Sequence, residues 1–557
     1  MVLHQFPAEE ERSLAQAKKQ NYLHGAAIMA GTTVIVKIVA FLYKIPLGDM
    51  RILGDEGFAH FNVAYNIYGF FLTLATAGFP VALSRMISVA DAQGRPAQVQ
   101  RIFRVALGTL AGIGGFFTLI MLLFHRQLSV VMADREASLS IVALAPAVVI
   151  VCVTSAYRGY CQGRGNMIPT AFGQVIEELG KLLVGLTLAW MLARSGKGLP
   201  AASAGAIFGV TAGAMAALIY MAVYKRRYYP ETTFGADDVP DHASDVMRSF
   251  LSIGIPIAIG ASVLSMINLL DNALSLNRLQ SAAGFEAKMA HTLYGVYGKA
   301  QTLYNLPSYF ITPLTLSVVP AIATCLTRRE RAQASEIAES SLRIASAIAM
   351  PMGVGLFVLA EPVFRVIYWG SNPAGPVLLR MLGIAAFFVC MSMMGNAILQ
   401  AVGQEKLPIL SILLGGAVKI AVNWVLVGNP RVNITGAPVG SICCFVAICA
   451  ADYYFLCRSL KNRPRLSRVL GAPLLSCAAM GVTARGVYAL AARVLFRPGI
   501  PEGRLQMMIA MAAAIAAAVL VYAVMIGLTG AVTQEDMELI PKGEKIGKLL
   551  HLRRAKR

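Results

Sequence analysis

Four lysines lie deep within long apolar stretches of this sequence, where a charged side chain is costly. They are Lys37, Lys181, Lys299 and Lys419. An ionisable residue at the centre of a membrane span costs roughly 2.5–3.5 kcal/mol on insertion scales, so it marks a functional site by default. Lys37 lies about 21 Å into its stretch at 1.5 Å per residue, too deep for its amine to reach the near surface easily. These lysines are therefore the first candidates for binding a ligand.

The same stretches hold carboxylates, and two further cations lie at their ends. These residues are Glu177, Glu178 and Asp271, with Arg85 and Lys44. Glu177 and Lys181 share one helix face, so we expect them to neutralise each other, whereas Glu178 needs another partner. Because cations outnumber anions in this set, a dry cavity lined by them would favour an anionic guest such as a phosphate or pyrophosphate. The alternative is a structural role, in which each lysine pairs with a carboxylate or a helix C-terminus.

Membrane-spanning helices must position these side chains. Only 14% of the 557 residues are charged and 57% are hydrophobic, whereas about 25% of an ordinary soluble protein is charged. This composition excludes soluble globular, disordered and disulfide-scaffold proteins. A spanning helix needs roughly 20 apolar residues. Fourteen stretches meet that length: 23–44, 59–83, 104–124, 140–160, 169–193, 201–224, 249–275, 293–324, 342–364, 379–401, 407–428, 434–456, 469–492 and 505–529. We predict an all-α polytopic membrane protein.

The basic residues predict the orientation of the chain. A net charge of +20 would suggest a nucleic-acid partner in a soluble protein. Here most of the 49 Lys and Arg residues fall in alternate loops, with clusters at 225–227, 328–331 and 458–468. The positive-inside rule then places both termini of this multi-pass protein in the cytoplasm. We expect the clusters to contact lipid headgroups of the bilayer, and no nucleic acid.

Two stretches 238 residues apart indicate an internal duplication, with chance similarity between apolar helices as the alternative. They read YCQGRGNMIPTAFGQVIEELGKLLVG from Tyr160 and ILQAVGQEKLPILSILLGGAVKIAVN from Ile398. We predict two six-helix lobes related by a parallel pseudo-two-fold axis, plus two extra C-terminal helices. The predicted parts are a cytoplasmic segment 1–22, an N-lobe 23–224, an inter-lobe loop 225–248, a C-lobe 249–456, the last two helices at 469–529 and a basic tail 530–557.

Several motifs carry a resemblance that covers almost the whole chain. They are LGDEGFAHFNVAYNIYGFFLTLATAGFPVALSRMIS from Leu53, RGYCQGRGNMIPTAFGQVIEE, IGIPIAIGASVLSMINLLDN and LYNLPSYFITPLTLSVVPAIA. Together they resemble the polysaccharide-exporter branch of the multidrug/oligosaccharidyl-lipid/polysaccharide flippase superfamily. Within it, the sequence is most similar to MurJ-type lipid II flippases and to stage V sporulation protein B. The C-terminal stretch TQEDMELIPKGEKIGKLL resembles the tail of that subgroup.

The resemblance implies a function in the bacterial cell membrane. Such proteins have two helical lobes around a cationic cavity and move an undecaprenyl-pyrophosphate-linked peptidoglycan precursor to the outer leaflet by alternating access. The two added helices would form a groove for the lipid tail, and cell-wall synthesis enzymes are candidate partners. The family's helix 1 arginine corresponds to Lys37, and a following Arg-Asp pair reads Tyr43 and Lys44 here. Two further cavity arginines fall on Asn66 and Thr302.

Three alternatives remain open at this point. A cation-coupled multidrug exporter of the same architecture should have surplus carboxylates in its cavity, and an exporter of another lipid-linked oligosaccharide would share the basic cavity. A non-transporting scaffold for cell-wall or spore-cortex assembly would tolerate neutralised lysines.

An enzyme is not expected. The DDxxD pattern at Asp237, Asp238 and Asp241 is interpreted as a solvated loop and not as a Mg²⁺ site. We interpret His242 and His291 as solitary, and no cofactor or metal site is expected.

Overall fold

The computed structural model describes residues 28–29, 31–229, 238–495 and 503–531. Every regular element in these ranges is helical, which confirms the predicted all-α class. Internal packing divides the chain into two compact units. Unit 1 takes in the described residues of Met1–Tyr43, Ala64–Ser129 and Glu136–Met266, and unit 2 those of Lys44–Val63, Val130–Arg135 and Ile267–Arg557.

Unit 1 is built around α6. Its helices are α3 (Phe79–Ala92), α4 (Pro96–Leu123), α6 (Ser138–Gly163), α7 (Ile168–Arg194) and α8 (Leu199–Tyr228), with parts of α2 (Gly54–Thr76), of α5 (His125–Val131), of α9 (Ala243–Ser281) and of a helix over 31–47. α6 packs against α3, α4 and α8, and α7 packs along α8. Gly180 faces Gly213 and Gly185 faces Gly209 across the α7–α8 contact, because only small residues let two backbones approach so closely.

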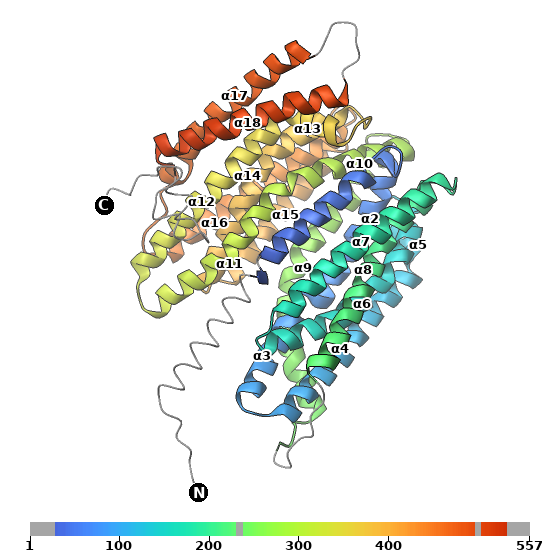
Figure 1. Cartoon of the computed structure of the whole chain (residues 1–557), viewed down its shortest axis with the longest axis vertical. Helices are drawn as coiled ribbons and strands as arrows, with labels where there is room; N and C mark the ends of the chain where they lie inside the picture. Colours follow the sequence, from blue (N-terminus) through green and yellow to red (C-terminus); the bar gives the residue numbers. More distant parts are fainter. Residues whose placement is uncertain (1–27, 30, 230–237, 496–502, 532–557) are drawn as a thin grey trace. The chain divides into compact units, whose positions relative to one another are not determined.

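Unit 2 is built around α14. Its helices are α10 (Ala287–Tyr304), α11 (Leu306–Thr327), α12 (Arg331–Val358), α13 (Ala360–Ile367), α14 (Ala374–Ala401), α15 (Lys406–Leu426), α16 (Gly436–Ser459), α17 (Ala472–Leu495) and α18 (Arg504–Thr529). α14 packs against α10, α11, α12, α13 and α16, and a buried apolar core that includes Ile311, Leu342 and Met394 fills the contact. The last two helices, α17 and α18, pair with each other and attach to α12 and α13 (Figure 1).

Three predicted single spans are each two helices in the structure. The stretch 59–83 is divided between α2 and α3, 293–324 between α10 and α11, and 342–364 between α12 and α13. Pro80 lies in the first turn of α3 and Pro307 in the first turn of α11. Proline lacks the backbone N–H of a continuing helix and restricts the residue before it, so the helix ends there and a new one begins.

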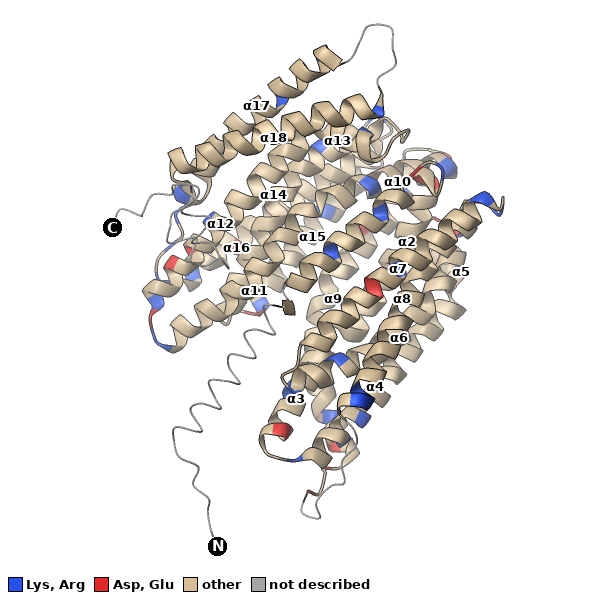
Figure 2. Ribbon diagram, viewed as in Figure 1, with Lys and Arg blue, Asp and Glu red and all other residues tan. Residues whose placement is uncertain are grey.

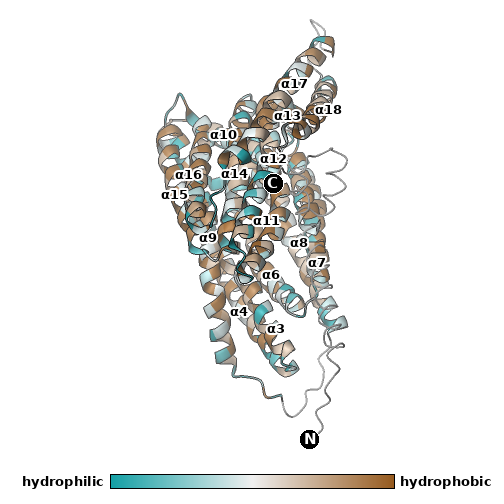
Figure 3. Ribbon diagram, turned by 90° about the vertical axis from the view of Figure 1, so that its left-hand side faces the viewer, coloured by the Kyte–Doolittle hydropathy of each residue, from teal (hydrophilic) through white to brown (hydrophobic). Residues whose placement is uncertain are grey.

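Twelve helical segments of the described chain are long and apolar enough to cross a membrane. They account for all predicted spans except 23–44 and 169–193. Only part of the stretch 23–44 is described, as the helix over 31–47. The stretch 169–193 is α7, which is not counted because Glu177, Glu178 and Lys181 make it more charged than the other spans. Most charged residues lie near helix ends (Figure 2), and apolar residues cover much of the helices between them (Figure 3).

Some sequence-based predictions fall outside the described residues. The segment 1–22, nearly all of the tail 530–557 with its TQEDMELIPKGEKIGKLL motif, and Asp237 of the DDxxD pattern are among them.

Candidate functional site

In unit 1, Lys181 is a buried cation with a carboxylate partner on its own helix. Its side chain on α7 is 5% exposed, and its Nζ lies 3.1 Å from a carboxylate oxygen of Glu178. The amine also lies 5.3 Å from the ring centre of Tyr43 and 5.6 Å from that of Tyr65. A cation over two aromatic faces in a desolvated site is stabilised by both rings. The Tyr43 hydroxyl in turn donates to the carbonyl oxygen of Ala206, 2.7 Å away.

The expected pairing of Glu177 with Lys181 is wrong. Glu177 accepts from Arg158 of α6, whose Nη2 lies 2.5 Å from the carboxylate. The neighbouring Glu178 binds Lys181 three residues along the helix and also interacts electrostatically with Lys37. Helix spacings of three and four residues both bring side chains together, so the partner on the adjacent helix decides which pair forms. Arg158 gave no signal in the sequence beyond its place inside an apolar span.

In unit 2, Lys419 and Asp271 form a second buried pair. The Nζ atom of Lys419 on α15 lies 2.8 Å from Asp271 of α9, and their side chains are 7% and 2% exposed. Asn423, one turn after Lys419, donates its amide to the other oxygen of Asp271. The carboxylate is therefore bound on both oxygens, as a buried charge requires.

Lys299 of α10 forms a third buried pair, with a residue that sequence analysis did not select. Its Nζ lies 2.6 Å from Asp55 at the start of α2, and its side chain is fully buried. Asp55 also accepts from the Ser371 hydroxyl at 2.5 Å and from the Asn372 backbone N–H at 3.0 Å. This carboxylate thus connects α2, α10 and the loop before α14. Asp55 was not selected from the sequence because it lies just before the predicted span 59–83.

The remaining predicted site residues are less enclosed. Lys37 and Lys44 on the helix over 31–47 are half-buried, and Arg85 on α3 is exposed. Thr302 is buried, and its hydroxyl donates to the carbonyl of Gly298. The structure thus brings Lys181 together with Glu178 and Lys419 together with Asp271, each within one unit. It pairs Lys299 elsewhere, so the predicted substrate-binding set stays a prediction.

The described part of the DDxxD pattern is a loop in which Asp241 is exposed, as expected, but Asp238 and Asp241 also make specific contacts at the start of α4. Asp238 accepts from the backbone N–H of Ala97 in the first turn of α4. Asp241 lies 3.1 Å from Arg95 and accepts from Gln98. Both carboxylates are therefore held against the N-terminus of α4, where the helix dipole and unpaired N–H groups favour negative charge. These contacts explain the acidic pattern structurally.

A groove of about 820 Å³ runs along α17 in unit 2. Apolar side chains from α12 and α17, among them Phe357, Leu474 and Val482, make up most of its lining. Two arginines, Arg380 of α14 and Arg485 of α17, also line it. By its chemistry, a mostly apolar groove with two arginines is suited to a long hydrocarbon chain that carries an anionic group.

A family model described as "Polysaccharide biosynthesis protein" matches residues 22–326, which is more than half of the chain. The chain belongs to the polysaccharide biosynthesis protein family. This confirms the resemblance to the flippase superfamily branch that the sequence motifs indicated.

Three relatives of this family member come from Bacillus subtilis (strain 168). The uncharacterized membrane protein YabM is 27% identical over 95% of this chain and 96% of its own. Stage V sporulation protein B is 26% identical over 76% and 81%. Lipid II flippase MurJ is 24% identical over 73% and 77%. The chain therefore matches most of the length of each.

Two solved structures establish the fold of the family member. Lipid II flippase MurJ in an inward closed conformation aligns with a TM-score of 0.59 at 12% identity, covering 90% of this chain and 98% of that one. An inward-facing multidrug resistance MATE family transporter of the MOP superfamily aligns with a TM-score of 0.62 at 15% identity, over 78% and 98%. At these identities the likeness concerns fold alone.

Proposed function

We propose that this protein flips an undecaprenyl-pyrophosphate-linked peptidoglycan precursor from the inner to the outer leaflet by alternating access. The observation that carries the proposal is the groove along α17, lined by apolar side chains with Arg380 and Arg485. A polyprenyl tail would pack against the apolar side chains of this groove, and a pyrophosphate would form charge-assisted hydrogen bonds with its arginines. The relative named lipid II flippase MurJ supports the same class of cargo.

In this proposal the pyrophosphate meets Lys37 at a different step of transport from the one at which it binds the groove arginines. Lys181, Lys299 and Lys419 each bind a carboxylate, whereas the half-buried Lys37 shares Glu178 with Lys181. An inside-negative membrane potential favours outward movement of an anion by about 2.3 kcal/mol per charge per 100 mV. The membrane potential would therefore assist the outward transport of an anionic headgroup.

Complementation of a strain depleted of its lipid II flippase tests this function. We expect the wild-type chain to restore growth and precursor exposure on the outer leaflet, and the substitution R485A to reduce exposure severalfold. Arg493→Ala is the matched control, because Arg493 is an exposed arginine on the same helix that is absent from the groove lining. No rescue by a wild-type chain that inserts normally would reject this cargo. Equal exposure with the two variants would reject the groove.

A cation-coupled multidrug exporter is the second candidate, and one residue favours it. Asp452 of α16 is 2% exposed and lines a pocket of about 380 Å³, and no salt bridge to it is found among the described residues. A carboxyl group in such a site suits proton or cation binding. Raised drug resistance in cells that express the chain, abolished by D452N, would select the exporter. Unchanged resistance together with rescue of the depleted strain would select the flippase.

A further inference from the structure

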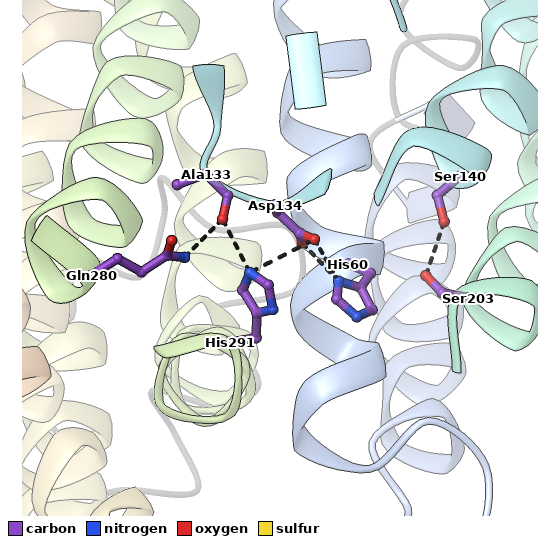
Figure 4. Close-up of polar contacts among 7 residues, drawn as sticks. All are labelled: His60, Ala133, Asp134, Ser140, Ser203, Gln280 and His291. Atoms are coloured by element: carbon purple, nitrogen blue, oxygen red, sulfur yellow. Dashed lines mark hydrogen bonds and ion pairs between the residues drawn. The ribbon is translucent and has the colours of Figure 1, made fainter. Parts of the chain in front are cut away.

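Unit 2 brings together a group of metal-ligating side chains from two helices that are far apart in the sequence, α2 and α10. One potential ligand atom from each of Glu56, His60 and His291 lies within 4.8 Å of the other two. His60 and His291 are buried and Glu56 is half-buried. The two imidazole rings are 5.2 Å apart, edge to face. Asp134 lies between them (Figure 4). His291, interpreted as solitary from the sequence, is therefore part of a cluster.

A second layer of acceptors fixes the orientation of both imidazoles. The Nδ1 atom of His60 lies 2.7 Å and 2.8 Å from the two carboxylate oxygens of Asp134. The Nε2 atom of His291 lies 3.1 Å from the carbonyl oxygen of Ala133. A neutral imidazole that donates through one nitrogen presents a lone pair on the other. Carboxylate and carbonyl acceptors behind histidine ligands are the usual outer partners in metal sites, and they set the tautomer.

The surrounding helices hold these groups in place. Glu56 and His60 lie four residues apart on one face of α2. Gly295, one turn after His291, lets α10 contact the backbone of α2, because a Cβ there would overlap the carbonyl oxygen of Asp55. The loop that carries the acceptors is held in turn by α9. Gln280 donates to the carbonyl of Ala133 at 2.8 Å.

We propose that Glu56, His60 and His291 bind a divalent transition-metal ion, with Zn²⁺ the best match, and that Asp134 and the Ala133 carbonyl orient the two histidines. Two neutral imidazoles and one carboxylate form a known three-ligand set for Zn²⁺, with water as the fourth ligand. Two positive charges would balance the carboxylates of Glu56 and Asp134. Metal–ligand bonds of about 2.0–2.2 Å place tetrahedral ligands about 3.4 Å apart. The ligand atoms, now within 4.8 Å of one another, therefore need to approach each other by up to about 1.4 Å to bind the ion.

The same groups could instead share a proton, as a charged His60 paired with Asp134. The two occupants predict different affinities. Imidazole nitrogens favour Zn²⁺ and Co²⁺ over Mg²⁺ and Ca²⁺. A proton-sharing pair would take up none of these ions in a saturable way.

Titration of the purified full-length protein with Zn²⁺ or Co²⁺ alone tests the proposal. After chelator treatment and its removal, we expect one ion per chain by calorimetry and elemental analysis, and a tetrahedral Co²⁺ absorption spectrum. Mg²⁺ should not compete. We expect H60Q and H291Q to lose this binding, and D134N to weaken it by about 10–100-fold.

His125→Gln is the matched control, because His125 pairs with Ser138 in unit 1 and contributes nothing to the cluster. If the buried variants fail to fold, E56Q gives the same test at a half-buried position, with a loss of affinity expected. Wild-type protein that takes up less than one ion per chain would overturn the site. Wild-type affinity in E56Q, or equal losses in E56Q and His125→Gln, would also overturn it.

Discussion

Replacing Lys419 by methionine removes one half of a buried ion pair and leaves the other half in place. Asp271 would remain buried in unit 2, with the Asn423 amide as its only remaining side-chain hydrogen-bond donor among the described residues. Removing one partner of a buried pair costs about 3–5 kcal/mol because the remaining charge is uncompensated. With an unfolding entropy of about 2 cal/mol/K per residue, a chain of this size loses roughly 1 °C of melting temperature per kcal/mol. We therefore expect Lys419→Met to lower the melting temperature by about 3–5 °C.

The double substitution of Lys419 by methionine and Asp271 by leucine removes both charges. Replacing a buried pair by apolar side chains of similar volume is often neutral or stabilising, so we expect its melting temperature within about 2 °C of wild type. Lys406→Met is the matched control, because Lys406 is exposed at the start of the same helix. Surface substitutions of this kind change stability by about 0.5 kcal/mol or less.

Thermal unfolding of the purified variants in detergent, followed by the loss of monodisperse protein, measures these shifts. If Lys419→Met is as stable as the Lys406→Met control, the claim that losing Lys419 leaves a costly unpaired charge in unit 2 is refuted. If the double variant is no more stable than Lys419→Met, Lys419 acts through something other than Asp271. Precursor exposure with the double variant then separates a structural lysine from one that the cargo contacts.

Three further outcomes are expected. Asp55→Asn leaves a buried lysine unpaired, so we expect a loss of about 3–5 kcal/mol, measured as a lower melting temperature and faster proteolysis. Gly295→Ala should destabilise the protein by about 1–3 kcal/mol, because its Cβ would overlap Asp55. The same change at Gly355, where a Cβ meets nothing within 4 Å, should be neutral or stabilising in a melting assay. Lys37→Ala should reduce precursor exposure in a depleted strain and Lys37→Arg should retain it, whereas normal exposure with alanine would reject the headgroup contact.

Hydropathy predicted the helices well because a bilayer imposes one simple length requirement on every span. It could not find the breaks at Gly78 and Asn305, where an apolar stretch continues across two helices. Proline signals were present at both places. To recognise these prolines as helix starts, one needs to know how the neighbouring helices pack, and a single sequence does not contain that information.

The polar partners were harder to predict than the helices. The residues that bind Lys299, Lys419 and Glu177 lie 244, 148 and 19 positions away along the chain. Spacing rules reach only partners on the same helix face, so they suggested Glu177 for Lys181 and missed Arg158. The histidine cluster escaped notice for the same reason, because its ligands come from two distant helices and its acceptors from a loop.

Once the ion pairs are taken into account, the excess of positive charge lies in unit 1 and not in the paired lysines of unit 2. In unit 2 the buried lysines Lys299 and Lys419 are matched by Asp55 and Asp271. In unit 1 three cations, Lys37, Lys181 and Arg158, face the two carboxylates Glu177 and Glu178. If the proposed headgroup binds in unit 1, this excess of cations would attract its negative charge. If that attraction drives headgroup binding, Glu178→Gln should tighten the binding of a soluble pyrophosphate analogue. Neutralising Asp271 alone would destabilise unit 2 first, because it removes the partner of Lys419.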